Sequence, residues 1–266
     1  MIEASQLPPR LCEGLTPYQL EQLTGEQADL AVEILQAQGL ALTLQEGGRF
    51  RPATCDLPVS SATFCIVDIE TNGSKPDKHQ IIEIGAVKVQ NLHIIDRFES
   101  LVRCDHISGH ITEITGIAES DTNDAPPMRE VLAAFKAFLG TDIFVGHDVK
   151  FDFRFTSKMM ERVGMAPLLN RTLCTIDLAE RTISSYRYGL AFLNEQLELY
   201  KEATHHRALS DAMTTAKLFK RTLKYLPTDI RTVEELITFS KQAKRLKRPK
   251  FPPETVQKPD ADGTDD

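Results

Sequence analysis

The chain has 266 residues, 41% of them hydrophobic and 26% charged, with a net charge of −7, so any binding to a polyanion must come from local basic patches. Because it contains neither 18 consecutive apolar residues nor the basic and apolar segments of a secretory signal, we expect a cytoplasmic protein that contacts no membrane. Five scattered cysteines without a CxxC pair favour reduced thiols over a disulfide framework or a zinc site.

Residues 1–57 are predicted to form a small winged-helix-like accessory module. A Thr-Pro pair at 16–17 has the pattern of an N-cap followed by proline in the first helical turn. A second helix over about 26–38 places four apolar residues on one face and ends at a glycine. Alternating leucines and a Gly-Gly turn within 40–50 then predict a hairpin.

The charge of this module disfavours binding to DNA. Residues 1–57 contain three basic and eight acidic residues, a net charge of −5. Non-specific affinity for DNA comes mainly from lysine and arginine contacts to phosphates. We therefore expect residues 1–57 to pack as an accessory module or to dock another protein, with DNA contact as the less favoured alternative.

Residues 62–226 are predicted to form one α/β domain, because strand and helix patterns alternate along them. Strands are predicted at 63–69, 81–89, 92–102, 143–146 and 171–177. Helices are predicted at 128–139, 151–163, 190–198 and 208–225. Three strands joined by hairpins, followed by strands that alternate with helices, indicate a mixed sheet covered by helices.

Residues 227–266 are predicted to form a helical basic segment followed by a disordered acidic C-terminus. A helix is expected over 231–245, and the prolines beyond it disfavour its continuation. The run KQAKRLKRPK at 241–250 contains six basic residues and no acid. It is either a solvated face or a phosphate-binding patch, and we expect it to help hold nucleic acid.

Two acidic residues end the first predicted strand of the α/β domain. In FCIVDIETNG at 64–73, Asp68 and Glu70 are two residues apart and therefore point to the same face. Burying unpaired carboxylates is unfavourable, whereas a hard cation such as Mg²⁺ would bind both. Asp152, near the start of a helix, and Asp211, beside a helical apolar stripe, are candidates to join them. Taken singly, Asp152 could complement a helix dipole and Asp211 could be a surface acid or a salt-bridge partner.

Three motifs, DIETNG at 68–73, HDVKFD at 147–152 and HRALSDA at 206–212, resemble in this order the DEDDh family of 3′–5′ exonucleases. This family includes the proofreading epsilon subunit of bacterial DNA polymerase III. The segments IIEIGAVKV, ITGI and YGLAFLNEQLEL, between these motifs, extend the similarity over about residues 62–226. The resemblance implies a ribonuclease-H-like fold, in which helices flank a five-stranded mixed sheet.

The resemblance also implies a role for each matched residue. Two divalent metal ions, Mg²⁺ or Mn²⁺, would be bound by Asp68, Glu70, Asp152 and Asp211. His206, five residues before the last of these acids, would be the general base that takes a proton from the attacking water. The neighbouring His205 does not have this spacing.

Thr71 and Phe151 match positions that line the terminal-nucleotide pocket in relatives; the alternatives are a turn residue for Thr71 and core packing for Phe151. Two other positions depart from the family pattern. Asp148 replaces the usual asparagine of the second motif, which adds a carboxylate near the entrance of the site. Thr115 stands where the epsilon subunit has a histidine, which weakens any prediction of how the terminal bases are separated.

The resemblance therefore predicts a metal-dependent 3′–5′ exonuclease that hydrolyses terminal phosphodiesters and releases nucleoside 5′-monophosphates. Its substrate is expected to be the 3′ end of a single-stranded nucleic acid, with DNA favoured over RNA, in proofreading or repair. An RNA exonuclease with the same site is one alternative, since the two differ in handling the 2′-hydroxyl. A non-catalytic adaptor with a nuclease fold is the other, and the complete set of four acids and a histidine argues against it.

Overall fold

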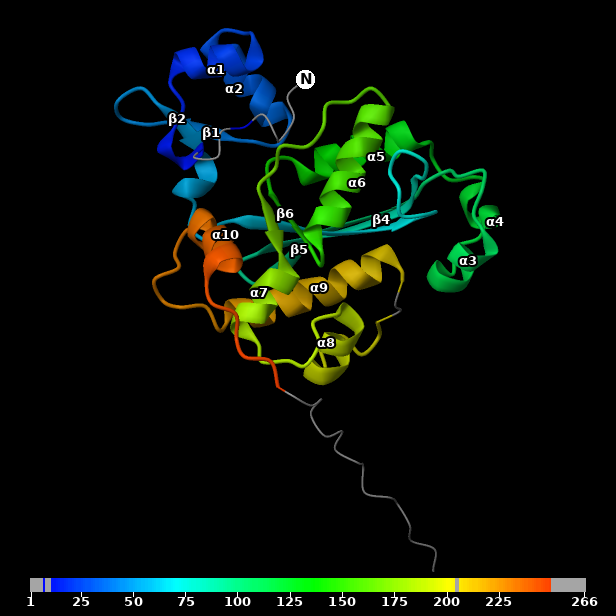
Figure 1. The fold of residues 1–266 in the computed structure, drawn as a ribbon. Coiled ribbons are helices and arrows are strands. Elements are labelled where there is room, and N and C mark those ends of the chain that lie inside the picture. Colours follow the sequence, from blue (N-terminus) through cyan, green and yellow to red (C-terminus); the bar gives the residue numbers. More distant parts are fainter. Residues whose placement is uncertain (1–6, 8–10, 204–205, 250–266) are drawn as a thin grey trace, which may run out of the picture.

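Figure 1 shows the computed structural model, which describes Leu7, residues 11–203 and residues 206–249. A central sheet separates two layers of helices, and a smaller unit lies beside one end of this sheet. The predicted disordered C-terminus and Lys250, the last residue of the basic run, lie outside the described residues. Within the described part, no helix is long and apolar enough to cross a membrane.

Across residues 63–174, five strands form the central sheet in the order β5-β4-β3-β6-β7. Their bounds are Thr63–Thr71 (β3), Ile81–Gln90 (β4), His93–Leu101 (β5), Ile143–Gly146 (β6) and Thr172–Cys174 (β7). β3, β4 and β5 pair antiparallel, whereas β6 runs parallel to β3 and β7 runs parallel to β6. This arrangement confirms the predicted five-stranded mixed sheet.

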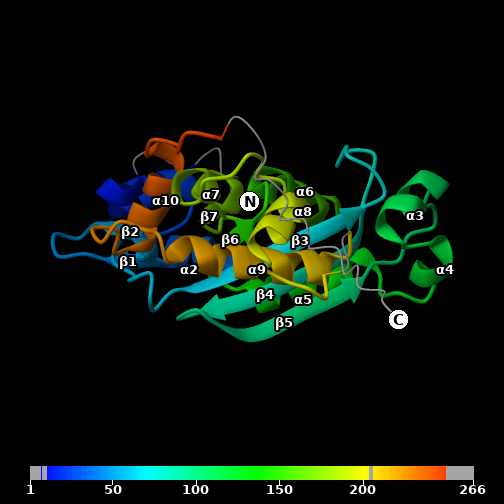
Figure 2. The same cartoon turned by 90° about the horizontal axis from the view of Figure 1, so that it is seen from below.

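The side chains of β3 alternate between two separate cores. On one face, its odd-numbered apolar residues pack with α5 (Met128–Leu139) and α6 (Val149–Arg162). On the opposite face, its even-numbered apolar residues pack with α9 (Ala208–Leu223), and the rings of Phe64 and Phe219 are 4.8 Å apart. Figure 2 shows α9 lying along β3 and β4. Because the alternation continues, the two acids near the end of β3 lie on the α9 face.

One predicted strand is too long, and three helices have no counterpart in the prediction. The strand expected at 171–177 is only β7, because helix α7 (Thr175–Thr182) begins inside it. Four of the five buried residues of α7, at 175, 178, 179 and 182, follow a helical spacing; the fifth is Glu180. Helices α3 (Gly109–Thr115) and α4 (Glu119–Thr122) are too short for a helical period to be visible in the sequence. The predicted helices at 128–139, 151–163, 190–198 and 208–225 are confirmed to within two residues.

The smaller unit has the predicted order of two helices and a hairpin: α1 (Pro17–Thr24), α2 (Ala28–Ala37), β1 (Leu42–Leu44) and β2 (Phe50–Pro52). Thr16 caps α1, and its side-chain oxygen accepts a hydrogen bond from the Gln19 N–H. The apolar core of the unit includes Leu169 of the α/β domain, whose N–H donates to the Gln38 carbonyl at 2.7 Å. The unit therefore packs directly on that domain, and its winged-helix-like character stays a prediction.

Helix α10 (Val233–Gln242) lies within the helix predicted at 231–245 and ends three residues earlier. The residues that follow it, up to 249, form an irregular segment that contacts α7. The guanidinium groups of Arg245 and Arg248 both pair with the Glu180 carboxylate, and the Leu246 N–H donates to the Glu180 carbonyl. Two arginines of the basic run are therefore engaged in ion pairs within the protein.

Candidate active site

The C-terminal half of β3 places Asp68 and Glu70 on the α9 face of the sheet. Their partners in the antiparallel register on β4 are Gly85 and Glu83, respectively. A Cβ on Gly85 would be 2.1 Å from the backbone nitrogen of Leu209, in the first turn of α9. Glycine at this position therefore lets α9 approach the sheet closely beside the two acids.

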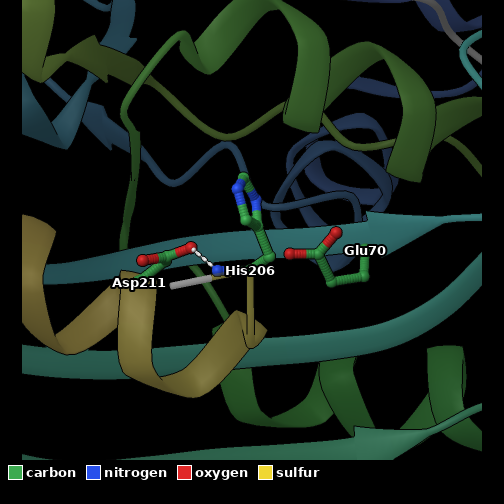
Figure 3. A group of neighbouring side chains, drawn as sticks. All are labelled: Glu70, His206 and Asp211. Atoms are coloured by element: carbon green, nitrogen blue, oxygen red, sulfur yellow. Dashed lines mark hydrogen bonds between the residues drawn. The ribbon is translucent and has the colours of Figure 1, made fainter. Parts of the chain in front are cut away.

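Asp211 lies in that first part of α9 and is 8% exposed. Its Oδ2 accepts a hydrogen bond from the backbone N–H of His206 at 2.9 Å (Figure 3). His206 has a φ of 61°, which is uncommon for a residue with a side chain, and its side chain is exposed. One ligand atom from each of Glu70, His206 and Asp211 lies within 4.8 Å of the other two. The fold thus brings together the first and third motifs.

Asp152 reaches the site from the other layer of helices, in the first turn of α6. Its side chain is 5% exposed, and a Cβ on Gly146, at the end of β6, would be 2.8 Å from its Oδ2. Gly146 therefore leaves room for this carboxylate at the edge of the sheet. After burial, the Asp152 charge has the largest influence in raising the pKa of Asp68, which places the second motif beside the first.

Burial and mutual repulsion raise the pKa of three of these acids. Burial raises the pKa of Asp68, and the carboxylates of Asp152, Asp211 and Glu70 raise it further. Burial and then the Asp211 carboxylate raise the pKa of Glu70 to about 7. Burial, followed by the charges of Asp148 and Glu70, raises the pKa of Asp152. A hard divalent cation, bound through oxygen atoms, would remove this repulsion, so the set of donors fits Mg²⁺ or Mn²⁺.

Glu83, to which the sequence patterns assign no role, holds the start of α9 in place. Its side chain is completely buried and accepts hydrogen bonds from Arg207 Nη2 at 2.7 Å and from the Ala208 N–H at 2.8 Å. These contacts fix the turn immediately after His206. The available signal was an acid in the mostly apolar strand IIEIGAVKV, although the sequence alone does not identify its partner.

His147, in the second motif, is another residue that sequence patterns leave without a role. Its Nε2 is 2.8 Å from the Tyr188 carbonyl oxygen, and its Nδ1 is 2.9 Å from Thr175 Oγ1. Burial lowers the pKa of His147 to about 4, so the ring is neutral at pH 7. Because a carbonyl can only accept, Nε2 carries the proton; Nδ1 lies beside the Thr175 hydroxyl, whose oxygen is also 3.2 Å from the Gly146 carbonyl oxygen. His147 thus ties the end of β6 to α7 and to the segment before α8 (Leu190–Leu197).

The two predicted pocket residues occupy different places around the acids. Thr71 is the last residue of β3, follows an irregularity in the β3–β4 register and is half-buried. Phe151 is 37% exposed and lines a cavity of about 650 Å³ at the start of α6, together with Asp148 and Pro76. Within the described part of the chain, Thr71 is not among the residues that line this cavity. Asp148 is exposed and adopts a φ of 81° at the N-cap of α6.

Residues 65–219, more than half of the chain, match the family model described as Exonuclease, that of RNase T. A stretch of 179 residues, 66% of this chain, is 36% identical to the PolC-type DNA polymerase III of Staphylococcus saprophyticus. A stretch of 166 residues, 62% of this chain, is 36% identical to the PolC-type DNA polymerase III of Staphylococcus aureus. The chain spans only 12% of the length of each of these relatives.

Two solved structures show the same fold. Exonuclease X in complex with 5′ overhanging duplex DNA has a TM-score of 0.54 and 27% identity, over 66% of this chain and 99% of that chain. The zinc-bound form of the E. coli Exonuclease I complex with single-stranded DNA has a TM-score of 0.55, over 62% of this chain and 42% of that chain. Its identity is 18%, so this second likeness concerns the fold alone.

The mixed sheet and the acids gathered at its edge define the class of this domain, a ribonuclease-H-like exonuclease fold. The chain belongs to the exonuclease family, and within it to the DEDD 3′–5′ exonucleases, as its motifs predict. The matched residues 65–219 fall inside the predicted domain 62–226. The boundaries of the three predicted domains, 1–57, 62–226 and 227–266, stay predictions.

Proposed function

We propose that this chain is a metal-dependent 3′–5′ exonuclease that hydrolyses the terminal phosphodiester of a single-stranded nucleic acid and releases nucleoside 5′-monophosphates. The observation that carries the proposal is the convergence of four acids at one place: Asp68, Glu70, Asp152 and Asp211. Their mutual repulsion lowers the stability of the metal-free fold. A non-catalytic adaptor would gain nothing from this arrangement, whereas a metal-dependent enzyme requires it.

The four acids would hold two divalent ions, Mg²⁺ or Mn²⁺. Such a pair of ions, when bound, stabilises the charges that develop on the attacking and leaving oxygens of an in-line displacement. Since burial and the Asp211 carboxylate raise the pKa of Glu70 to about 7, a cation competes with a proton at Glu70 near neutral pH. Metal affinity is therefore expected to increase with pH.

His206 would accept the proton of the attacking water as a general base. Its side chain is exposed, so water and the 3′ end of a nucleic-acid strand can reach the imidazole. Its backbone is held from two sides, by Asp211 at its own N–H and by Glu83 at the N–H of Ala208. These hydrogen bonds fix the main chain at His206 and leave its imidazole available to accept a proton, which supports the role of general base.

Thr71 and Phe151 would contact the terminal nucleotide. The exposed Phe151 ring offers a face on which a base can stack, and Lys150 and Arg154 line the cavity beside it with positive charge. The names of the relatives and solved neighbours, DNA polymerases and DNA complexes, support DNA as the preferred substrate. RNA is the alternative substrate of the same site.

Residues 1–57 would dock a protein, and the PolC-type relatives support a DNA polymerase as this partner, in proofreading or repair. The acidic character of the module argues against DNA as its ligand. The basic segment after α10 would contribute to holding the substrate through the lysines that are not in the two arginine ion pairs.

A 5′-labelled single-stranded DNA and the matching RNA, each incubated with Mg²⁺, Mn²⁺ or EDTA, test the proposal. With metal, the wild type should produce a ladder that shortens from the 3′ end, faster on DNA, with nucleoside 5′-monophosphates as products. Asp68→Ala should lose this activity, and Asp29→Ala, at an exposed position of α2, should keep it. Undigested substrates under every condition would favour the adaptor, and faster digestion of RNA would contradict the preference for DNA.

A further inference from the structure

Two cysteines that are far apart in the sequence meet in the smaller unit. Cys12 lies in the 3-10 helix η2 (Leu11–Glu13) and Cys55 ends the 3-10 helix η3 (Ala53–Cys55). They are separated by 43 positions, yet their Sγ atoms are 2.8 Å apart. Both are free thiols; Cys12 is exposed and Cys55 is half-buried. This spacing is shorter than a non-bonded contact between two sulfur atoms and approaches the length of a disulfide, about 2.05 Å.

The backbone around Cys12 is fixed in this position. Leu15 and Phe50 exchange two backbone hydrogen bonds, at 2.6 and 2.7 Å, which join the segment after η2 to β2. Arg49 adds a hydrogen bond from Nη2 to the Gly14 carbonyl at 2.6 Å. Because η3 follows β2 directly, these contacts hold both cysteine-bearing segments in a common register. The close approach of the thiols therefore follows from the fold of the unit and not from a chance rotamer.

We propose that Cys12 and Cys55 are a site of reversible oxidation, at which a hydroperoxide converts the two thiols into an intrachain disulfide. The exposed Cys12 sulfur attacks the peroxide and becomes a sulfenic acid, and one water molecule leaves. The Cys55 sulfur then attacks the Cys12 sulfur, forms the S–S bond and releases a second water. Overall, two thiols lose two protons and two electrons to one hydrogen peroxide, which becomes two water molecules. A dithiol reverses the reaction by exchange.

The surroundings of the pair make this reaction slow at neutral pH. Burial raises the pKa of Cys12 and of Cys55, and the thiolate is the reactive form of a cysteine. The charged groups that face the pair are of both signs: Arg51, which pairs with Asp56, Arg171 and Glu234. We therefore expect the rate of oxidation to increase as the pH rises. At neutral pH, the two thiols should stay reduced unless the exposure to the oxidant is prolonged.

The bond would close a loop that contains α1, α2, β1 and β2, that is, every α-helix and strand described in the smaller unit. A cross-link of this kind restricts the unfolded chain and stabilises the folded unit. The smaller unit lies toward the start of β3, whereas the acids lie toward the end of β3 (Figure 1). The proposal therefore does not depend on the function proposed for the acids.

Peptide mapping of the full chain by mass spectrometry, without reduction, tests the proposal after treatment with hydrogen peroxide at mildly alkaline pH. We expect a Cys12–Cys55 linked peptide, a loss of two of the five thiols titrated after denaturation, and a rise of several degrees in Tm. Dithiothreitol should reverse all three. Cys12→Ser and Cys55→Ser should each abolish the linked peptide and the rise in Tm.

Cys104→Ser is the matched control, because it removes a thiol from a different part of the chain and should leave the oxidation unchanged. Absence of the linked peptide in the wild type would overturn the proposal. So would links that join other cysteine pairs or two chains in its place. A linked peptide without any change in Tm would overturn the stabilising role of the bond.

Discussion

The carboxylates of the candidate site repel one another as long as no cation is bound. Burial raises the pKa of Asp68, of Glu70 and of Asp152, and the charges of neighbouring acids raise each one further. Neutralising one acid should relieve the repulsion among the others, and it also removes an oxygen ligand. The stability of the metal-free chain and its response to metal should therefore change in opposite directions.

Asp211→Asn separates these two effects. The asparagine retains an oxygen that can accept the hydrogen bond from the His206 N–H, but it carries no charge. We expect a higher Tm than the wild type in EDTA at mildly alkaline pH and little further rise with Mn²⁺. Exonuclease activity should fall by about 100-fold or more. Differential scanning fluorimetry measures the first two effects, with Asp29→Asn as the control; a lower Tm in EDTA would contradict the repulsion.

Glu83→Gln tests whether the buried acid on β4 positions the turn that carries His206. Glutamine can still accept from the Ala208 N–H, but its pairing with the Arg207 guanidinium is weaker. We expect kcat to fall about 10- to 100-fold with little change in KM, as for other residues that orient a functional group. Arg207→Lys keeps the positive charge and should lose less. Steady-state kinetics that show an unchanged kcat for Glu83→Gln would remove the positioning role.

Among the elements, α6 and α9 reach the acids from opposite faces of one sheet, and a glycine allows each approach. Gly85 admits the first turn of α9, and Gly146 leaves space for Asp152 of α6. His147 then connects the end of β6 to α7 through Thr175 and to the segment before α8 through Tyr188. The geometry of the acids therefore depends on how these elements pack, and a half-buried neutral histidine is part of that packing.

The His147 connection should make stability depend on pH. Burial lowers the pKa of His147 from 6.5 to about 4. Below about pH 6.5 the unfolded chain takes up a proton that the folded chain does not accept until about pH 4. The contribution of neutral His147 to the free energy of unfolding is thus complete above about pH 6.5. It is lost as the pH falls through about 4, by an amount on the order of 3 kcal/mol.

His147→Gln removes this titration and keeps an amide that can donate to the Tyr188 carbonyl. The difference in the free energy of unfolding between wild type and His147→Gln, measured with urea at a series of pH values, should shrink from about pH 7 to about pH 4. The comparison cancels the contributions of the acids, which have the opposite sign because their pKa values are raised. A difference that stays constant with pH would contradict a neutral His147 in the folded chain.

The irregular segment after α10 is held on α7 by a side chain that is 5% exposed. The Glu180 carboxylate pairs with Arg245 and Arg248, and the Arg181 Nε donates to the Ala243 carbonyl at 2.8 Å. Glu180→Gln should lower the free energy of unfolding by about 1 to 3 kcal/mol, because hydrogen bonds to a charged group are lost. Urea unfolding measures this effect, and an unchanged stability would mean that the ion pairs are too exposed to matter.

The same variant tests the predicted contact of the basic run with nucleic acid. Without the Glu180 charge, the two arginines become available to phosphates. If the run holds the substrate, Glu180→Gln should bind single-stranded DNA more tightly, with a steeper dependence on salt. Fluorescence anisotropy over a salt series, in EDTA to prevent cleavage, gives both quantities. An unchanged salt dependence would assign the run to packing on α7 alone.

At the scale of the whole molecule, the smaller unit and the α/β domain share part of a core. Leu169 is 2% exposed and packs among the leucines of the smaller unit. Gln38 Nε2 donates to the Pro167 carbonyl at 3.1 Å, which strengthens the same contact. Glu234 of α10 accepts from both Arg171 and Thr54, at 2.6 and 2.7 Å. These contacts couple the two parts of the chain.

We therefore expect the reduced full chain to unfold in one calorimetric transition. Leu169→Ala should lower its stability by about 2 to 5 kcal/mol, because a cavity is left between the two parts. It should also lower the Tm of the whole molecule and not that of one part. Leu246→Ala, at an exposed position of the last described segment, is a control with the same change of side chain. Two separate transitions in the wild type would show that the smaller unit unfolds independently.

Local patterns in the sequence were sufficient for much of this protein. Strict alternation placed Asp68 and Glu70 on one face of β3, and helical spacing located α9 with Asp211 in it. The spacing of the third motif selected His206, which the structure places beside Glu70 and Asp211, whereas His205 lies outside the described residues. The placement of the acids follows from the periods of strands and helices, which depend on neighbouring residues only, whereas the choice of His206 follows from the resemblance to the family's third motif.

Contacts between distant segments were decided by the tertiary structure alone. Glu83 and Arg207 are 124 residues apart, and Cys12 and Cys55 are 43 apart, so no local period links either pair. The end of β7 at Cys174 depends on where its partner β6 stops, which sequence alternation in β7 cannot indicate. The sequence by itself therefore determined the family, the motifs and the order of the main elements. Only the packing of the elements determined which side chains hold the site in place, because such contacts depend on strand register and on the close approach of helices to the sheet.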